Sequence, residues 1–404
     1  MRVLVIAQYF PPDLGGASTR ASNVVKGLIR KGCFVKVVTA FPHYPQGEIP
    51  KIYRGKALRF EEGGIIKLIR VWIPSLPHNT IVNRILLHFC FIVSTLFALP
   101  FIGKVDVIWA ANPNLFSFFP AAIYSFLKRK PIVRNVDDLW PEVFYELGIV
   151  KSRPMRKMLD FLGKLSYAIP AAITPISPAY KKRIVEKYSI EAKKIHVIEV
   201  GVDEINEKIS YLKDNVKRNF IVMYSGILGV GYKFEDILKA AGYLSEYEDI
   251  IFVIRGIGES EAKIRRLIND LELKNVVLDT NLLPKPKLVE LLSSADVFLL
   301  PMNPINFVEE GLPTKIFEYQ AYGKPIICCS TGEPAKYIRQ TESGLVVKPG
   351  DPKNLAKAIL KLHKDRKLAF ELGLNGWKYV SRNLTSERIG ERMYDVFKSL
   401  RGCY

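Results

Sequence analysis

The sequence predicts an α/β protein built from parallel sheets, because short apolar runs alternate with amphipathic helical patterns in both halves of its 404 residues. Strands rich in Val, Ile and Phe that are separated by helices of about ten or more residues are typical of such sheets. At roughly 100–200 residues per domain, the length favours two domains. We therefore expect two Rossmann-like domains, each with its own sheet.

The first domain is expected over residues 1–200. Its predicted strands are residues 2–7, 34–39, 66–72, 105–110, 132–136 and 172–175. Amphipathic helices are predicted at 18–31 and 178–187. The first strand turns at Pro11 and Pro12, too early for the apolar region of a signal peptide, so we expect a cytoplasmic protein.

The second domain is expected over residues 201–384 and repeats the same scheme. Its predicted strands are residues 220–225, 250–254, 276–279, 297–300, 326–329 and 344–347. The segment 201–218 is rich in charge and poor in large apolar residues, which is typical of a linker. Residues 385–404 should form a C-terminal helix that can cross back onto the first domain.

Charge and cysteine content narrow the possible partners. The net charge of +19 is uneven, since residues 1–200 hold 29 Lys and Arg against 13 Asp and Glu, whereas residues 201–404 hold 30 against 27. The first domain should therefore attract a polyanion, whether nucleic acid, an anionic membrane or a phosphorylated substrate. The five cysteines show no Cys-x-x-Cys spacing and the five histidines are scattered, which argues against a zinc site and for a reducing compartment.

Residues 85–103 carry no formal charge and lie between Arg84 and Lys104. By length they could span a bilayer. The next predicted strand, 105–110, should nevertheless join the same sheet as 2–7, and one sheet cannot form from strands on opposite sides of a membrane. Three interpretations stay open: a transmembrane helix, a helix on a membrane surface, and an ordinary core helix.

The most informative stretch is residues 310–327, EGLPTKIFEYQAYGKPII. Pro313 fits the first turn of a helix, where its missing N–H would have no partner. The backbone amides from Gly311 to Lys315 would then face a ligand at the helix start, and such a site suits a phosphate. Lys315 adds a full positive charge.

Two glutamates in this stretch can accept hydrogen bonds from sugar hydroxyls: Glu310, in the expected loop, and Glu318, inside the expected helix. Their Glu-x7-Glu spacing, with Pro313-Thr314-Lys315 and Gly323-Lys324-Pro325 around it, resembles the motif of retaining glycosyltransferase family 4. The similarity extends over nearly the whole chain, and is strongest to the branch that builds bacterial or archaeal surface polysaccharides. It implies the GT-B fold, in which two Rossmann-like domains with parallel sheets face a central cleft.

This resemblance implies that the second domain binds a nucleotide sugar. Besides Glu318, the donor-binding residues it implies are Gly311, Leu312, Pro313, Thr314, Gly226, Gly229, Lys233, Arg255, Gly256 and Gly258. The glycine loops lack the Gly-x-Gly-x-x-Gly pattern and acidic residue of a nicotinamide site. Many members carry an Arg and a Lys where this chain has Ile227 and Tyr232, so the cations that bind the diphosphate stay open, with Lys233 and Arg255 as candidates.

The first domain, by the same resemblance, binds the acceptor. Gly15 and Gly16 match the family's acceptor-side glycine loop, where backbone can approach a ligand closely. Asp137 aligns with a histidine of many members and is a catalytic candidate together with Glu310 and Lys315. Asp138 and Trp140 follow the same predicted strand, at an edge where ligands bind in such sheets. The alternatives are a structural hydrogen bond for Asp137 and a solvated loop with Trp140 packed.

The implied reaction moves a sugar from a nucleoside diphosphate sugar, UDP-linked by preference, to a lipid-linked or saccharide acceptor with retention of configuration. Lys315 and the helix amides would stabilise the departing diphosphate. No Asp-x-Asp occurs, so we expect no metal and no other cofactor. The expected partners are the donor, the acceptor and the anionic inner face of the cell membrane, and not nucleic acid, because no nucleic-acid-binding signature is present. The alternatives are a nucleotide-sugar 2-epimerase, a sugar-sensing or scaffold protein without catalysis, and a non-catalytic basic protein that binds nucleic acid or membrane.

Overall fold

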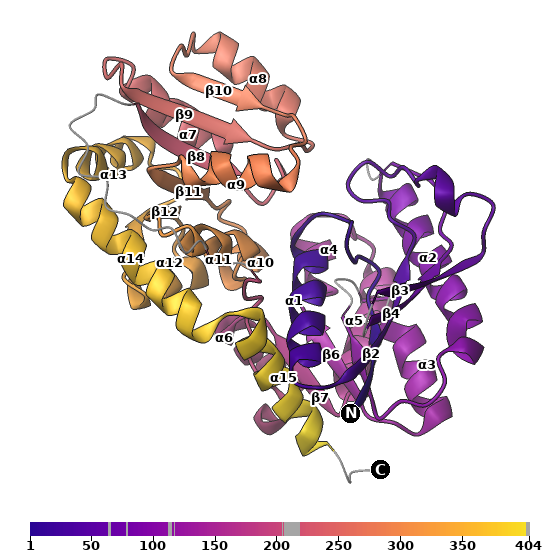
Figure 1. Ribbon diagram of the computed structural model, residues 1–404. Helices are drawn as coiled ribbons and strands as arrows, with labels where there is room; N and C mark the ends of the chain where they lie inside the picture. The colour runs from indigo at the N-terminus through magenta and orange to yellow at the C-terminus, as the bar shows by residue number, and fades with distance from the viewer. Residues whose placement is uncertain are drawn as a thin grey trace. The chain divides into compact units, whose positions relative to one another are not determined.

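The computed structural model describes residues 1–63, 66–77, 80–111, 115–116, 118–203, 205 and 219–400. The chain divides into two compact units, one formed by Met1–Gly201 with Ser386–Tyr404 and the other by Val202–Thr385 (Figure 1). We refer to them as unit 1 and unit 2. The expected linker at 201–218 lies almost entirely outside the described residues.

Unit 1 holds a seven-stranded sheet of order β3-β4-β2-β1-β5-β6-β7. Its strands are β1 (Arg2–Ile6), β2 (Phe34–Ala40), β3 (Leu58–Gly63), β4 (Ile66–Val71), β5 (Val107–Ala110), β6 (Ile132–Val136) and β7 (Ala172–Pro175). All pairs are parallel except β3 with β4. The sequence does not predict β3, because this edge strand carries Arg59, Glu61 and Glu62 and shows no apolar run.

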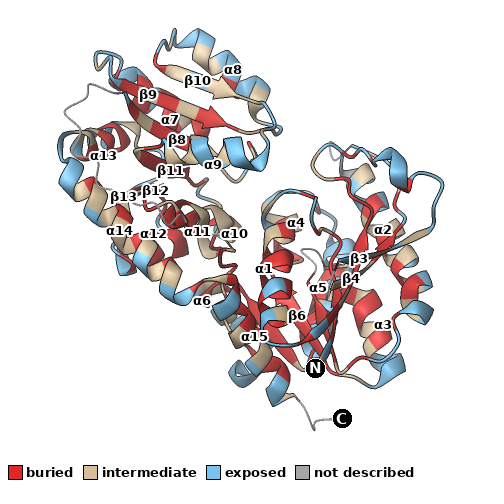
Figure 2. Cartoon of the chain, in the orientation of Figure 1, coloured by how far each residue is buried: buried red, intermediate tan, exposed pale blue. Residues whose placement is uncertain are grey.

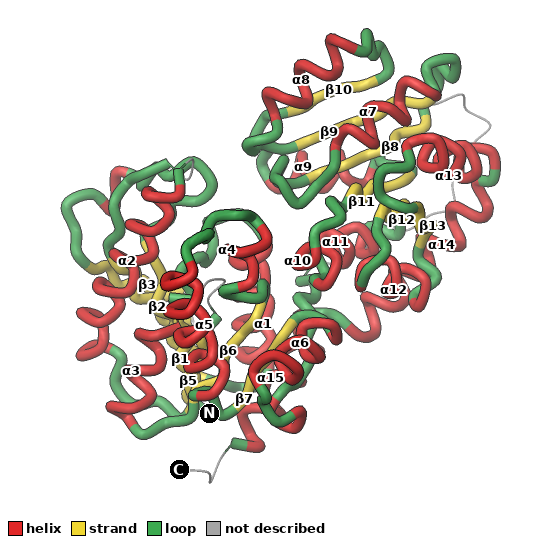
Figure 3. Tube along the Cα trace, turned by 180° about the vertical axis from the view of Figure 1, so that it is seen from behind, coloured by secondary structure: helices red, strands yellow, loops and turns green. Residues whose placement is uncertain are grey.

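Helices cover both faces of this sheet. They are α1 (Gly16–Arg30), α2 (Ile81–Ala98), α3 (Phe118–Lys128), α4 (Glu142–Glu146), α5 (Arg153–Ala168), α6 (Pro178–Tyr188) and α15 (Ser386–Ser399), with 3-10 turns at Lys51–Tyr53, Leu99–Phe101 and Ala192–Lys194. The helices α2 and α3 lie side by side on one face, as the view from behind also shows (Figure 3). Between them and the sheet lies a core that includes Ile6, Val38, Leu87, Phe91 and Phe118.

On the other face, α1 packs against α15 with almost no space between the two backbones. A Cβ atom added to Gly27 would lie 2.0 Å from the carbonyl oxygen of Ser386, and one added to Gly390 would lie 2.2 Å from the carbonyl carbon of Gly27. An ion pair of 2.6 Å between Lys31 and Glu391 borders this crossing. The helix α15, which follows unit 2 in the sequence, therefore belongs to unit 1.

Unit 2 holds a six-stranded, fully parallel sheet of order β10-β9-β8-β11-β12-β13. Its strands are β8 (Phe220–Ser225), β9 (Ile250–Arg255), β10 (Val276–Asp279), β11 (Val297–Pro301), β12 (Ile326–Cys329) and β13 (Gly344–Val347). Its helices are α7 (Phe234–Tyr243), α8 (Glu261–Asp270), α9 (Lys285–Ser293), α10 (Asn306–Glu310), α11 (Thr314–Ala321), α12 (Glu333–Gln340), α13 (Pro352–Lys364) and α14 (Arg366–Asn383). Central strands of both sheets are buried, whereas no residue of β3 is buried and three of its six residues are exposed (Figure 2).

The predicted α/β class is confirmed, and every predicted strand is present within two residues of its expected ends. The uncharged stretch expected at 85–103 is helical, but α2 begins earlier, at Ile81. The hydroxyl of Thr80 caps it by accepting a hydrogen bond from the amide of Asn83 at 3.2 Å.

Candidate functional site

In unit 2, the side chain of Lys315 lies against the turn that follows β8. A Cβ atom at Gly226 would come within 2.1 Å of Lys315 Cε and 2.6 Å of its Nζ. Gly226 also has a φ of 145°, a conformation that other residues rarely adopt. Glycine at this position is therefore what gives the ammonium group its place at the carboxyl end of the strand, where ligands bind in parallel sheets.

Two tyrosines hold this ammonium group in place. Lys315 Nζ donates a hydrogen bond of 3.2 Å to the hydroxyl of Tyr232, and it lies 4.6 Å from the centre of that ring and 5.5 Å from the centre of the Tyr224 ring. Cation–π contacts of this length are attractive. Tyr232 was noted from the sequence only as a departure from the family pattern, and the structure places it directly at the predicted lysine.

The glycine loops after β8 and β9 interlock. A Cβ at Gly256 would lie 1.7 Å from the carbonyl oxygen of Gly226, and one at Gly258 would lie 2.4 Å from the carbonyl oxygen of Leu228. The amide of Gly226 donates to the carbonyl of Arg255 at 2.9 Å. Gly229 differs, since a Cβ there would meet only the side chain of Ile227 at 3.7 Å. Gly256 and Gly258 are thus required for this close backbone approach, and Gly226 is required for the approach of Lys315.

Glu318 lies one turn after Lys315 in α11 and is half-buried. Burial raises the pKa of its carboxyl group, and the nearby charge of Lys315 partly opposes that rise. It makes no hydrogen bond to a residue that the structure describes, so its oxygens stay available to a ligand. The next residue, Tyr319, bonds through its hydroxyl to both the amide (3.0 Å) and the carbonyl (2.9 Å) of Ser225, which fixes α11 to the end of β8.

The start of α11 differs from the prediction in two details. Pro313 stands just before the helix in an extended conformation rather than in its first turn, and Glu310 is the last residue of the short helix α10 rather than part of a loop. Gly311 and buried Leu312 join the two helices. Because the first amides of a helix have no carbonyl partner within it, those of Thr314 and Lys315 remain suited to an anion.

Glu309, which no sequence motif indicates, fastens this segment. Its Oε2 accepts hydrogen bonds from Ser330 Oγ at 2.6 Å, from the amide of Thr331 at 2.9 Å and from the amide of Gly332. A Cβ at Gly332 would lie 2.0 Å from the Glu309 carbonyl oxygen. Since these partners lie about twenty residues away in the sequence, no local pattern could have identified them.

The two other predicted cations of unit 2 are paired with acids. Lys233 Nζ lies 3.6 Å from Asp236 Oδ1. Arg255 is buried, with its Nε 3.2 Å from Asp279 Oδ2 and its Nη2 donating to the carbonyl of Asn281 at 2.8 Å. The structure thus brings Lys315 to the glycine loop and gives Lys233 and Arg255 carboxylate partners.

In unit 1, the loop between β1 and α1 is held by a buried carboxylate. Asp13 Oδ1 accepts hydrogen bonds from the amides of His43 (2.7 Å) and Tyr44 (2.8 Å), and burial raises the pKa of Asp13 to about 6. Gly15 follows with a φ of 100°, and α1 begins at Gly16, two residues before its predicted start. This glycine turn therefore has a fixed backbone at the carboxyl end of β1.

Arg20 connects α1 to the end of β6. Its guanidinium is buried, donates to Asn135 Oδ1 at 2.6 Å and to the carbonyl of Ile198 at 2.8 Å, and lies 3.2 Å from Asp137 Oδ1. Burial raises the pKa of Asp137, and the charge of Arg20 opposes that rise. Asp137 is thus an ion-paired carboxylate of fixed position.

The neighbouring Asp138 has a different environment. It is half-buried and makes no hydrogen bond within the described part of the chain. Burial first, and the adjacent charge of Asp137 second, raise its pKa to about 7. Near neutral pH this carboxyl can therefore either donate or accept a proton. Trp140 packs edge-on against Phe144, with ring centres 4.5 Å apart, and is half-buried.

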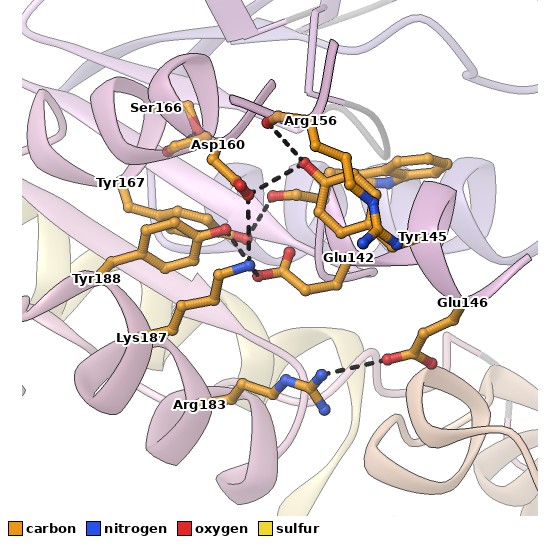
Figure 4. A network of polar contacts seen from close by, with 12 residues as sticks. Glu142, Tyr145, Glu146, Arg156, Asp160, Ser166, Tyr167, Arg183, Lys187 and Tyr188 are labelled. Carbon is orange, nitrogen blue, oxygen red and sulfur yellow. Dashed lines mark hydrogen bonds and ion pairs between the residues drawn. The ribbon is translucent and has the colours of Figure 1, made fainter. Parts of the chain in front are cut away.

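A polar network supports the loop that carries these residues (Figure 4). Buried Glu142 accepts a hydrogen bond from the hydroxyl of Tyr188 at 2.7 Å and pairs with Lys187 Nζ at 2.9 Å. Lys187 also lies 3.6 Å from Asp160, which accepts from the hydroxyl of Tyr145 at 3.0 Å. The loop after β6 is therefore anchored to α5 and α6.

No three His, Cys, Asp or Glu side chains among the described residues lie together so as to hold a metal ion. The groups that the structure does assemble are a lysine, two tyrosines, a glutamate and glycine turns in unit 2, and an arginine with two aspartates in unit 1. The first set suits a diphosphate with hydroxyl-bearing rings, and the second suits hydroxyl groups.

Comparisons with known proteins agree with this chemistry. The family model described as Glycosyl transferases group 1 matches residues 203–378, and the one described as Glycosyltransferase Family 4 matches residues 14–204. The chain is 25% identical over 294 residues to WcaI of Escherichia coli (strain K12), which is named as a glycosyl transferase of colanic acid biosynthesis, and this match covers 68% of the chain and 70% of WcaI.

Two solved structures share the fold at low identity. The sucrose-phosphate synthase of Thermosynechococcus elongatus superposes with a TM-score of 0.77 at 17% identity and covers 100% of both chains. Anabaena HepE, solved in complex with UDP-glucose, superposes with a TM-score of 0.67 at 16% identity and covers 99% of this chain and 100% of its own.

Proposed function

Since this chain belongs to glycosyltransferase family 4 and has its GT-B fold, we propose that it transfers a hexosyl residue from a UDP-linked sugar to a lipid-linked or saccharide acceptor, with retention of configuration. The product would enter surface polysaccharide or glycolipid synthesis, as the relationship to WcaI suggests. The observation that carries the donor assignment is the Lys315 ammonium held against Gly226 by Tyr232. The UDP preference is supported by HepE, whose structure holds UDP-glucose.

In this reaction the bond between the sugar and the diphosphate breaks, and negative charge grows on the departing diphosphate. Lys315 and the first amides of α11 are already oriented, so they stabilise that charge without rearranging. The hydroxyl oxygen of Tyr232 accepts from Lys315 and keeps its own proton, which it can donate to a phosphate oxygen. Glu318 accepts from the ribose hydroxyls and Glu310 from the hydroxyls of the transferred sugar.

On the acceptor side, we assign the reacting hydroxyl to the turn at Gly15 and Gly16 and the loop after β6. Asp137, fixed by Arg20, orients that hydroxyl, and Asp138 and Trp140 line the same edge of the sheet. The departing phosphate takes the proton of the acceptor hydroxyl as the new bond forms. Lys315 and the first amides of α11 then offset the negative charge of the departing diphosphate, so the reaction should need no divalent metal.

The first test is a thermal-shift screen of UDP, GDP, ADP and their sugar conjugates. A ligand at 100 times its Kd adds about 2.7 kcal/mol to the stability of the unit that binds it. For a unit of this size that corresponds to a rise in Tm of roughly 5–11 °C. A Lys315→Met variant should lose most of the rise, whereas Lys239→Met, at an exposed lysine of α7, should keep it. No shift with any nucleotide would refute the donor site.

Transfer is tested next with the donor identified in that screen. Proton NMR of the product gives the configuration at the new bond, and an inverted product would refute retention. Rates in excess chelator should stay within about a factor of two of the untreated rate. Loss of activity that magnesium or manganese restores would refute metal independence. Conversion of the donor to its C2 epimer without an acceptor would instead favour the 2-epimerase.

A further inference from the structure

The helix α2 has one face in the core of unit 1 and one face in solvent. On the core side of the helix, its residues Leu87, Phe91 and Ala98 are fully buried. On the other side Val82 is 73% exposed, Phe89 60% and Phe97 71%. The segment Val82–Phe101 is long and apolar enough to cross a membrane, yet only 22% of it is buried. Such exposure is unusual for a soluble protein and marks an interaction site.

The burial pattern of α2 bears on each of the three interpretations of the uncharged stretch. An ordinary helix on the face of a sheet carries polar residues on its solvent side, whereas the solvent side of α2 is largely apolar. A spanning helix would have to withdraw its buried residues from the core against β2 and β4. The structure is therefore consistent with a helix that keeps one face on its own sheet and offers the other to a partner.

An apolar groove adjoins the exposed face of α2. It encloses about 530 Å³ and runs between α2 and the β3–β4 edge. Leu58 of β3, Trp72 after β4, and Phe89, Val93 and Phe97 of α2 line it. Its lining is almost entirely apolar, so a ligand there would be a hydrocarbon chain or an apolar side chain rather than a polar head group.

Exposed apolar residues also lie on α3, which packs beside α2. Phe126 is 82% exposed there and Leu127 is also exposed. Phe60 and Phe101, both about half exposed, pack edge-on with their ring centres 5.4 Å apart and extend the same region. We define the α2 face as the exposed apolar residues of α2 and α3 together with this groove.

Positive charge borders the α2 face. Residues 51–104 hold eight Lys and Arg against two Asp and Glu. Both acids are already paired, Glu61 with Arg70 at 2.8 Å and Glu62 with Lys67 at 2.9 Å. Lys51, Lys56 and Lys104 are exposed and form no ion pair with a described residue, and Lys56 directly precedes Ala57 and Leu58 of the groove. The helix α3 ends at Lys128, which Arg129 and Lys130 follow.

We propose that the α2 face docks on an anionic lipid bilayer, with its aromatic side chains at the boundary between head groups and acyl chains, the lysines on the head groups, and one acyl chain in the groove. An apolar helix face bordered by unpaired lysines is the pattern of interfacial membrane helices, and Trp and Phe favour that depth. A protein partner would match the apolar face but not require the unpaired lysines. The inference concerns residues remote in sequence from the donor site, so it does not rest on the proposed reaction.

Sedimentation with phosphatidylcholine vesicles tests the dock, with and without about 30% phosphatidylglycerol. We expect the full chain to bind the anionic vesicles at about 0.01 M salt and to be released at about 1 M, where charges are screened within ~3 Å. Phe89→Asp combined with Phe97→Asp should weaken binding at least tenfold, and each lysine removed by on the order of fivefold. Phe161→Asp, at an equally exposed phenylalanine of α5, should bind as the parent does.

Trp72 reports on the groove itself. Lipids brominated in their acyl chains should quench the tryptophan fluorescence of the bound protein, and Trp72→Phe should remove most of that quenching although three other tryptophans remain. Circular dichroism and melting curves establish that each variant is folded. No binding to anionic vesicles at low salt, equal binding by the Phe89/Phe97 double variant, or an equal loss in Phe161→Asp would overturn the proposal. So would a soluble dimer that the double variant dissociates without any vesicle binding.

Discussion

Replacing Gly226 by alanine tests whether activity depends on the position of the Lys315 ammonium group and not only on the presence of that lysine. The new methyl group would lie 2.1 Å from Lys315 Cε, where carbon atoms normally keep about 3.5–4.0 Å. Because the lysine is flexible at its far end, it can move aside by roughly 1.5 Å, which takes its Nζ away from Tyr232. The φ of 145° adds about 1–3 kcal/mol of backbone strain.

Two measurable effects follow from this geometry. Displacement of a cation aimed at the departing diphosphate should lower kcat/KM by about 10²–10³-fold. The strain should lower the Tm of unit 2 by roughly 2–12 °C, so assays are run well below that temperature. Gly231→Ala is the matched control, since a Cβ there would meet only Val308 at an ordinary 3.7 Å.

A double-mutant cycle with Lys315→Met identifies the cause of the loss. If Gly226 acts through Lys315, adding Gly226→Ala to Lys315→Met should cost little further activity, because the displaced group is already gone. Steady-state transfer rates of the parent, both single variants and the double variant give the coupling. Full additivity of the two losses, or parental activity in Gly226→Ala, would refute the reasoning.

Four further outcomes are expected. Glu318→Ala should weaken donor binding by roughly 1.5–3 kcal/mol, measured by calorimetry, whereas Glu310→Ala should lower kcat by about tenfold to a thousandfold; parental kinetics in both would remove this motif from the donor site. Tyr232→Phe should lower kcat/KM by about tenfold while leaving the Tm within a few degrees, and an unchanged rate would show that its hydroxyl is not used. Asp138 has a raised pKa in the folded state, so its contribution to stability is present below pH 4 and is lost as pH rises through about 7; Asp138→Asn should therefore raise the Tm at pH 8 relative to the parent but not at pH 4, and parallel curves would contradict the pKa shift. Gly390→Ala should destabilise unit 1 by about 1–3 kcal/mol, seen as a lower urea midpoint, because backbone atoms on both sides cannot move aside; a parental midpoint would show that the helices separate freely.

The sequence predicted the sheets well because their central strands are buried on both faces. Such strands are short, continuous apolar runs, as in Val3–Ile6 of β1 and Val297–Leu300 of β11, and their length of four to seven residues distinguishes them from the longer apolar stretch of α2. The edge strand β3 escaped detection because its side chains are charged and half-exposed. The sequence predicts Pro313 in the first turn of a helix, whereas it stands just before the helix, since proline is compatible with both positions.

At the candidate site, the sequence predicts the residues that belong to a local motif but not those that act through contacts with distant parts of the chain. Lys315 and Glu318 stand in a recognisable local pattern. Glu309 and Tyr319 derive their roles from Ser330 and Ser225, which lie far from them in the chain. From the sequence, Tyr232 is recognisable only as a departure from the phosphate-binding cation that many family members carry there. No rule of spacing relates it to Lys315.

The crossing of α1 and α15 has a consequence for the synthesis of this protein on the ribosome. The glycine-bearing face of α1 is made early, but its partner emerges only after all of residues 202–385 have been translated. At about 5–20 residues per second, unit 2 has roughly 10–40 s to form before unit 1 can close. During that interval α1 presents a bare helix face to solvent, so nascent chains stalled before residue 386 should be sensitive to proteases in unit 1 and should bind chaperones preferentially.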